Sequence, residues 1–459
     1  MKRPEAPDVS VRPALDPSEA PDEVSRAELG RRGFLMSLGA FALAGCGAGA
    51  GQSAGGASRL LADATQTAAT TTAAFVHPGL LHTQADFDRM VAKYTTNPWS
   101  ASWNILIANS HASLSYKPNA QAIVYRGYDG VHPENYGYLF NDVAAAYQCA
   151  LRWKISGDTA YADKAVQIMN AWSSTLTSIQ GTTDAALAAG IYGYEFANAG
   201  EIMRTYSGWA AADFTAFQNM MRNVFYSINH DFLIRHNNTD VTHYWANWDL
   251  CQMASIMAIG VLCDDWSLFN EAVNYFTGGA GNGAVAQAVY YIHPGFLGQW
   301  QESGRDQGHA TLGIALMGAL CEMAWNQGVD LYGYDNNRFL MGAEYVAKSN
   351  LIQSGTTYYT VPYVPYNNVD NVQQNVFSTN SQGTPRPCWA LVYNHYVNRK
   401  GLAAPYSKQF ALVVQPEGGG GNYGSTSGGY DQLGYGTLTC TRDPIASGAA
   451  PSGLKARAP

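Results

Sequence analysis

The chain has 459 residues, of which 47% are hydrophobic and only 14% are charged, and its formal net charge is −8. This length and apolar share allow a large folded core, whereas the acidic balance argues against the basic footprint of a nucleic-acid-binding protein. Gly, Tyr and Trp are abundant in place of charge, which suits either a hydroxyl-rich ligand such as a carbohydrate or simply a weakly charged, secreted surface.

The N-terminal segment has the pattern of an export signal. Arg31 and Arg32 precede an apolar run over residues 34–44 that is too short to span a bilayer, so residues 1–46 are expected to form a twin-arginine signal. Cys46 ends a Leu-Ala-Gly-Cys sequence that resembles a lipoprotein processing box, although it can also occur by chance. We therefore expect a flexible tether over residues 47–74, with the protein a cell-surface or periplasmic lipoprotein, or secreted.

Apolar residues recur at three- and four-residue steps through most of the remaining chain, which predicts successive helices. The expected helices cover residues 84–93, a segment from 99, then 138–156, 161–176, 184–205, 210–228, 244–263, 266–276, 309–326 and 337–350. The connections are mostly short, and no convincing strand is expected before residue 355. Stacked helical hairpins of this kind predict an all-α fold, an α/α toroid with a central cleft.

The character of the sequence changes after Leu351, so residues 75–351 are expected to form the toroid and 352–459 a C-terminal extension. The extension is predicted to hold one further helix, over 386–398, and a Gly-rich coil over 417–434 that straps over the toroid. Six cysteines fall mostly within helical patterns and are expected to be buried thiols, because twin-arginine passengers fold in a reducing cytoplasm. No metal-binding spacing is present, and we expect no cofactor.

Two polar stretches stand just before long apolar helices. The first polar stretch covers residues 236–248 and the second covers 299–309, and both are rich in His, Asn, Gln, Arg and aromatic residues. Polar groups crowded at the starts of inner helices indicate a site more than a core. The sequence therefore predicts two walls of one sugar-binding cleft.

These residues resemble the alginate-lyase-like polysaccharide lyases, which have an α/α toroid. The resemblance covers roughly residues 75–350 and depends on His77-Pro78-Gly79, on the run from Gly157 to Ala165, on Asn237-Asn238 with His243-Tyr244-Trp245, and on the run from Gly304 to His309. The better-known alginate lyases place Asn-Asn-His contiguously and carry a Tyr at the position of Leu312. The arrangement is closer to the glucuronan/alginate lyase branch.

The resemblance implies β-elimination on a uronate polymer, with an acidic polysaccharide as the partner. His243 is expected to be the base, because its ordinary pKa suits proton abstraction near neutral pH, although it could instead cap the following helix. Arg305 is expected to neutralise the substrate carboxylate, unless it only pairs with Glu302 or Asp306. His309 could bind the carboxylate or act as a second acid or base, or could be a buried structural histidine.

The proton donor is the least determined role. Tyr244 beside His243 is the first candidate, with Tyr136, Tyr138 and Tyr291 as alternatives. On an ideal helix Asn247 would face the same way as His243, and His309 the same way as Arg305, since each pair is four residues apart. The remaining expected substrate-binding residues are Asn237, Asn238, Asn247, Gln301, Trp245, Trp300 and Tyr136. The asparagine pair could also be a plain turn, and core packing is expected for two of Trp245, Trp248 and Trp300.

Two other functions remain open. A glycoside hydrolase on the same fold would use a pair of carboxylic acids, for which Asp249, Glu302 and Asp306 are available. A glycan-binding lipoprotein would keep the aromatic residues without needing His243 and Arg305 together. The sequence does not determine the polymer. We expect a monomer with no nucleic-acid partner, attached to a membrane only through a lipid on Cys46.

Overall fold

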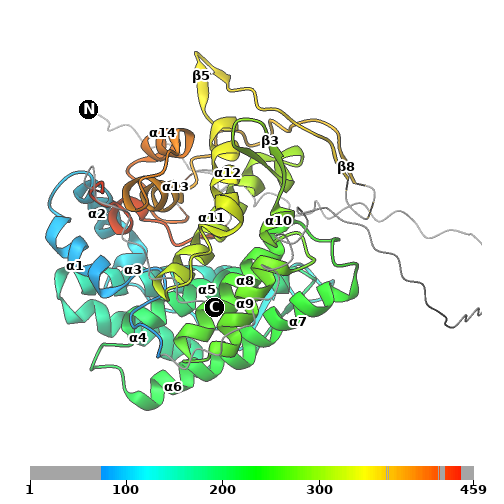
Figure 1. Cartoon of the computed structure of the whole chain (residues 1–459). Helices are drawn as coiled ribbons and strands as arrows, with labels where there is room; N and C mark the ends of the chain where they lie inside the picture. The colour runs from blue at the N-terminus through cyan, green and yellow to red at the C-terminus, as the bar shows by residue number, and fades with distance from the viewer. Residues whose placement is uncertain (1–73, 368–369, 371, 422, 424–428, 446–459) are drawn as a thin grey trace, which may run out of the picture. The chain divides into compact units, whose positions relative to one another are not determined.

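The computed structural model describes residues 74–367, 370, 372–421, 423 and 429–445. The expected signal and nearly all of the expected tether lie outside the described residues. Within the described part long helices dominate, and every sheet has only two short strands (Figure 1). None of the described helices is both long and apolar enough to cross a membrane.

The long helices follow one another as hairpins, close to the ranges that the sequence predicts. They are α1 (Gln84–Lys93), α2 (Trp99–Ala108), α3 (Tyr136–Ser156), α4 (Thr159–Ser173), α5 (Ala185–Met203), α6 (Ala211–Met220), α7 (Ser227–Arg235), α8 (Ala246–Leu262), α9 (Trp266–Gly278), α11 (Gln307–Asn326) and α12 (Tyr334–Ser349). A π-helical turn over Met221–Tyr226 joins α6 to α7, so the predicted 210–228 helix continues to Arg235. Short α10 spans Val285–Ala288.

Four helices form the inner layer of the toroid. Helices α3, α5, α8 and α11 pack against one another in that order, and each is followed in the chain by a helix that packs on its outer side. Helices α5, α8 and α11 are buried along almost their whole length, as expected for helices that are apolar on every face. The predicted all-α toroid is confirmed.

Two glycines allow α5 and α8 to approach closely. A Cβ atom on Gly190 would lie 2.4 Å from the Cys251 sulfur, and one on Gly193 would lie 2.1 Å from the Ser255 hydroxyl oxygen. Real Cβ atoms cannot sit so close, so larger residues would push the helices apart. This contact brings the N-terminal halves of α5 and α8 side by side.

The expectation of no strand before residue 355 is wrong. Strand β1 (Ile123–Arg126) pairs in parallel with β2 (Ser178–Gly181), and β3 (Val289–His293) forms a hairpin with β4 (Leu297–Trp300). All four residues of β4 are buried, so the strand has no alternation of apolar and polar residues to detect. Two more short pairs follow, β5 (Ile352–Ser354) with β6 (Thr357–Tyr358) and β7 (Tyr366–Asn367) with β8 (Gln373–Gln374).

The expectation of one further helix in the C-terminal extension is also wrong. The predicted helix there is α13 (Trp389–Tyr393) continued by a π-helical turn over Asn394–Arg399, and it is followed by α14 (Pro405–Val414) and short α15 (Gly436–Thr439). Proline at the first position of α14 is a helix-start signal, because its fixed φ suits that position. The described part of the Gly-rich coil is largely buried, as Glu417 and Asp431 illustrate.

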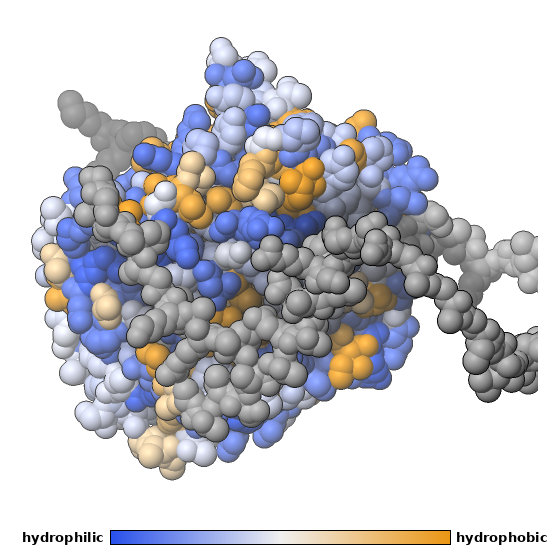
Figure 2. Space-filling view, in the orientation of Figure 1, coloured by the Kyte–Doolittle hydropathy of each residue, from blue (hydrophilic) through white to orange (hydrophobic). Residues whose placement is uncertain are grey.

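The six described cysteines are unpaired, and four of them are buried. This confirms the interpretation of these residues as thiols. On the face shown in Figure 2, hydrophobic residues form separate groups between hydrophilic ones. The visible part of this face is thus a mixture of polar and apolar residues, in spite of the low share of charged residues.

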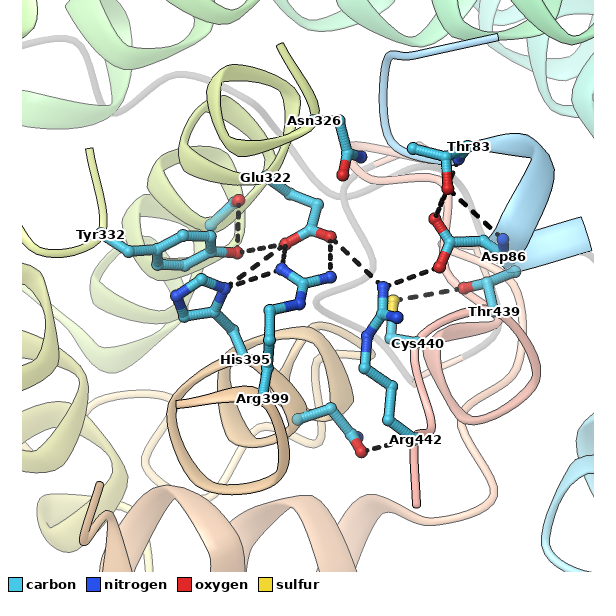
Figure 3. Close-up of polar contacts among 12 residues, drawn as sticks. Thr83, Asp86, Glu322, Asn326, Tyr332, His395, Arg399, Thr439, Cys440 and Arg442 are labelled. Atoms are coloured by element: carbon cyan, nitrogen blue, oxygen red, sulfur yellow. Dashed lines mark hydrogen bonds and ion pairs between the residues drawn. The ribbon is translucent and has the colours of Figure 1, made fainter. Parts of the chain in front are cut away.

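A buried network of charges fixes the C-terminal segment between α1 and α11 (Figure 3). The Arg442 guanidinium donates to the Asp86 carboxylate of α1 at 2.7 Å and lies 3.8 Å from the Glu322 carboxylate of α11. Glu322 also accepts two hydrogen bonds from Arg399, at 2.7 and 2.9 Å. Arg89 contacts Asp86 at 2.7 Å. The Arg442–Asp86 pair joins segments that are 356 residues apart.

Replacement of Asp86 by Asn should destabilise the protein at neutral pH by about 3 kcal/mol, because it removes the buried carboxylate that pairs with both Arg442 and Arg89. Burial opposes ionisation of Asp86, but the charges of Arg442 and Arg89 outweigh it and hold its pKa below the ordinary 3.8. The stabilisation is therefore complete above that pH and declines as the pH falls below it.

Denaturant unfolding of the full chain at a series of pH values measures this effect. The difference in the free energy of unfolding between wild type and Asp86→Asn should become smaller as the pH is lowered. Asp88→Asn is the matched control, because Asp88 is an exposed acid on the same helix. A difference in unfolding free energy that does not change with pH would contradict the stabilising role of the ionised Asp86 carboxylate. An equal loss of stability in Asp88→Asn would also contradict it.

Candidate active site

The two polar stretches meet, as the sequence predicts. The Asn247 side-chain amide, in the first turn of α8, donates to the Glu302 carboxylate at 2.7 Å. Arg305 donates to the same carboxylate oxygen at 3.1 Å. The backbone N–H of Ala246 donates to the Gln301 side chain at 3.1 Å. The two stretches are therefore adjoining walls, joined by buried hydrogen bonds.

Arg305 is paired with Glu302 rather than standing free. It also lies 3.7 Å from the Asp306 carboxylate, and its guanidinium covers the Trp245 ring at 5.3 Å. The Arg305 side chain nevertheless remains 25% exposed, whereas Glu302 is fully buried. A partly exposed guanidinium fixed on a ring is suited to bind an incoming carboxylate.

Asp306 caps the start of α11 and holds His309. One Asp306 oxygen accepts the His309 backbone N–H at 2.7 Å, and the other contacts the His309 Nδ1 at 2.6 Å. Burial opposes ionisation of Asp306, but the hydrogen bonds and charge of His309, with the charge of Arg305, outweigh it and lower its pKa. His309 is 40% exposed, so it is not a buried histidine.

Two expected helical relations do not occur. Helix α11 begins at Gln307, after Arg305, so Arg305 and His309 do not share a helix face and are connected through Asp306 instead. Helix α8 begins at Ala246, so His243 precedes it and does not share a face with Asn247. Both helices start after the first residue of the pair, because Asp306 and Trp245 have extended backbones as N-caps.

His243 lies in a turn and is paired with a residue from a distant segment. Its Nδ1 is 2.6 Å from the Asp370 carboxylate, and the two side chains are 29% and 41% exposed. Because an ionised carboxylate only accepts hydrogen bonds, the neutral ring would keep its proton on Nδ1, which donates to Asp370, and would leave Nε2 as a base. A helix-capping role for His243 does not apply, since the N-cap of α8 is Trp245.

Tyr366 of strand β7 joins the same region. Its hydroxyl accepts a hydrogen bond from the Gln301 side chain at 2.9 Å and donates to Asn282 at 3.3 Å. The Tyr366 ring centre is 6.3 Å from that of Trp245. Burial raises the pKa of Tyr366, while the hydrogen bonds with Gln301 and Asn282 partly oppose this shift. Sequence analysis missed both Tyr366 and Asp370, because no local motif marks them.

The predicted Asn237, Asn238 and Tyr244 form a tight turn before α8. Both asparagines have left-handed backbones, with φ of +52° and +63°. Asn237 donates to the Tyr244 hydroxyl at 2.9 Å, whereas exposed Asn238 accepts from Arg235 at 3.5 Å. The turn that the sequence leaves open is therefore present. Left-handed backbone is costly for most residues and tolerated by Asn, which explains the residue type.

Tyr244 packs among aromatic residues and is only 8% exposed. Its ring centre lies 4.4 Å from that of Trp248 and 5.1 Å from that of Phe232. With its hydroxyl occupied by Asn237, this residue is better placed to position Asn237 than to reach a substrate.

The expectation that Trp300 binds substrate is wrong. Trp300 has no exposed surface and packs between α11 and α12, where the space left by Gly313 and Gly342 accommodates its ring. Trp248 packs against Phe232 and Tyr244. Trp245 is half-buried beneath Arg305 and is the one of the three tryptophans placed at the wall of the site.

Tyr136 lies apart from these contacts, at the start of α3. Its ring is covered by the Arg126 guanidinium at 5.0 Å and lies 6.4 Å from the Tyr192 ring of α5. The structure thus brings together Asn247, Gln301, Arg305, His309 and Trp245, and places Tyr136 on another part of the inner layer.

Comparison with known proteins identifies the family of this chain. The family model for alginate lyase matches residues 89–355, more than half of the chain. Alginate lyase A1-III from Sphingomonas species A1 has a similar structure, with a TM-score of 0.54, 13% identity, and coverage of 81% of this chain and 98% of that one.

Two variants of alginate lyase A1-III complexed with a tetrasaccharide are also similar. The first has a TM-score of 0.55 and 12% identity, covering 78% of this chain and 94% of that one. The second has a TM-score of 0.52 and 14% identity, covering 78% and 95%. A search of curated proteins found no match. Because the family model spans most of the toroid and the fold agrees, the chain belongs to the alginate lyase family and is a polysaccharide lyase.

Proposed function

We propose that this polysaccharide lyase cleaves a uronate polymer of the alginate or glucuronan type by β-elimination. The observation that carries the proposal is the position of Arg305 over the Trp245 ring. Trp245 follows His243 by two residues, and His243 is paired with Asp370. A cation for a carboxylate and an oriented base are thus supplied at one helix start. The solved A1-III complexes contain a tetrasaccharide, which supports an oligosaccharide ligand for this fold.

In this mechanism Arg305 pairs with the carboxylate on C5 of the sugar, which makes the C5 proton more acidic. His243 takes that proton on Nε2, while Asp370 holds Nδ1 and stabilises the positive ring. The electron pair of the C5–H bond forms a C4=C5 double bond, and the C4–O4 bond breaks. A proton donor then protonates the leaving O4 oxygen.

Tyr366 is our choice of proton donor. Its phenol is protonated near neutral pH, as that of any tyrosine with an ordinary or raised pKa would be. It also contacts Gln301, which is joined to the start of α8. Tyr244, the first choice from the sequence, is more deeply buried and engaged with Asn237.

The hydrolase alternative has less support, because its three carboxylates are already engaged. Asp249 is buried against His236 at 3.0 Å and the Gly283 N–H at 2.8 Å. Glu302 is fully buried beneath Asn247 and Arg305, and Asp306 caps α11. No pair of them is left to flank a glycosidic bond. The non-catalytic alternative would give no reason for the His243–Asp370 pair.

The first prediction concerns the reaction. The full chain, given separate uronate polymers, should produce the ultraviolet absorbance of an unsaturated uronate with at least one of them. His243→Ala and Arg305→Ala should each lower kcat/KM by about 100-fold or more, since they remove the base and the carboxylate partner.

His230→Ala and Arg222→Ala are the matched controls, because these residues pair with Glu271 and Asp265 outside the site. Their activity should stay close to that of wild type. Reducing ends that accumulate without ultraviolet absorbance would indicate hydrolysis, and polymer binding without any cleavage would favour the glycan-binding alternative.

The second prediction separates the two tyrosines. Tyr366→Phe should lower kcat by about 100-fold with little change in KM, because it removes the transferred proton, and the hydrogen bonds lost with it, to Gln301 and Asn282, are made within the protein. Tyr244→Phe should change kcat less, since it removes one hydrogen bond to Asn237. Steady-state rates of both variants, with circular dichroism to verify folding, decide the question. A larger loss of kcat in Tyr244→Phe than in Tyr366→Phe would indicate that Tyr244 is the proton donor.

We also propose that the chain is exported by the twin-arginine pathway and that Cys46 carries a lipid. The basis is the Arg31-Arg32 pair and the sequence that ends at Cys46. Cells that express the full chain should place labelled lipid on the protein, and Cys46→Ala should abolish labelling. If the wild-type protein is exported but carries no labelled lipid, it is secreted without a lipid anchor.

A further inference from the structure

Arg126 differs from every other arginine that the structure describes. Each of the others donates at least one hydrogen bond to a carboxylate or to a polar protein atom, and those bonds fix its position. The Arg126 side chain has none, and its Nη1 nitrogen is buried without a partner. No carboxylate lies within ion-pair distance of it among the described residues. A buried donor without a partner is costly, so this position calls for an explanation.

The position of Arg126 is well determined by its surroundings. It ends strand β1, whose backbone is paired with β2 from Ile123 to Arg126. Its guanidinium lies over two aromatic rings, 5.0 Å from the centre of Tyr136 and 5.9 Å from that of Tyr192. The side chain as a whole is half-buried. The charge is therefore held on an aromatic surface, much as Arg305 is held on Trp245.

Arg126 belongs to the same rim of the toroid as the candidate active site. Because each inner helix is followed by a returning outer helix, the inner helices run in one direction and begin at one end. Contacts between the N-terminal halves of these helices agree with this alignment, from Tyr136 of α3 to Tyr192 of α5, and from Gly190 of α5 to Cys251 of α8. Asn247 and Glu302 continue the series to α11. Arg126 thus stands at the start of α3 and Arg305 at the start of α11.

Two acids lie near Arg126, and neither forms an ion pair with it. Glu134 accepts a hydrogen bond from the backbone N–H of Gly127, the next residue in the chain. Asp184, the N-cap residue of α5, interacts with Arg126 electrostatically, but the two form no ion pair. The remaining close neighbours are the phenols of Tyr136 and Tyr192 and the thiol of Cys251. The guanidinium is therefore not neutralised by direct contact within the protein and can accept an external carboxylate.

We propose that Arg126 binds the carboxylate of a second uronate residue of the same polymer, away from the sugar that is cleaved. This inference rests on the proposed function, since it takes the substrate to be a uronate chain. Such a chain presents one carboxylate per sugar, so a polymer lying along the rim meets Arg305 at the cleaved residue and Arg126 farther along. Tyr136, an expected substrate-binding residue, supplies the aromatic support for this second site.

The test uses the full chain and two substrates, a long uronate polymer that the wild type cleaves and a trisaccharide of the same sugar. Arg126→Gln should raise KM for the polymer about tenfold, with kcat changed by less than about threefold, because one charged contact is lost. It should not change KM for the trisaccharide, because α5 and α8 lie between α3 and α11, and neighbouring helix axes are about 8–10 Å apart. The salt dependence of kcat/KM on the polymer should also weaken.

Two further variants complete the test. Arg126→Lys keeps the charge and should recover part of the polymer KM. Arg152→Gln is the matched control, because Arg152 also covers a tyrosine ring, at 3.8 Å, but is paired with the Ala112 carbonyl. Arg152→Gln should leave KM unchanged for both the polymer and the trisaccharide. If Arg126→Gln does not fold, the Lys variant decides by the same comparison of the two substrates.

An unchanged polymer KM in Arg126→Gln, or an equal rise for both substrates, would overturn this inference while leaving the proposed function intact. A wild-type protein that cleaves none of the uronate polymers would instead overturn the proposed function, and this inference with it.

Discussion

A single buried carboxylate, that of Glu302, joins the two halves of the candidate active site. One of its oxygens accepts hydrogen bonds from Asn247 of α8 and from Arg305 before α11, and the other has no partner among the described residues. Because an ionised group without partners is expensive to bury, Glu302 depends on both donors, and their positions depend on it. Arg305 is thereby fixed over Trp245 and its remaining surface directed to a ligand.

This arrangement requires that the inner helices start at one level. The close approach of α5 and α8 through Gly190 and Gly193 sets that level, and the Glu302 contacts extend it to α11. Helix starts carry unpaired backbone N–H groups and partial positive charge, which favour an anionic ligand. A rim built from several such starts, with arginines on aromatic rings, is chemically suited to a polymer that carries regularly spaced carboxylates.

Segments far along the chain complete the site. Asp370 contacts His243, and Tyr366 contacts Gln301, although each lies more than 60 residues away from its partner. The C-terminal segment has a parallel role in the fold, since Arg442 lies between Asp86 and Glu322 and connects α1 to α11 (Figure 3). The last hundred residues thus contribute to the closure of the toroid as well as to the positions of reactive groups.

The sequence by itself determined the helices, the order of the hairpins and the two polar stretches, because these depend on local periodicity and on residues close in the chain. It also indicated Arg305, His243 and their likeness to known lyases. Only the tertiary structure decided which residues meet. In the structure Trp300 lies in the core, and α8 and α11 begin after His243 and Arg305. Asp370, Tyr366 and unpaired Arg126 became candidates only through their tertiary contacts. Burial and long-range pairing depend on packing between helices, which no local pattern records.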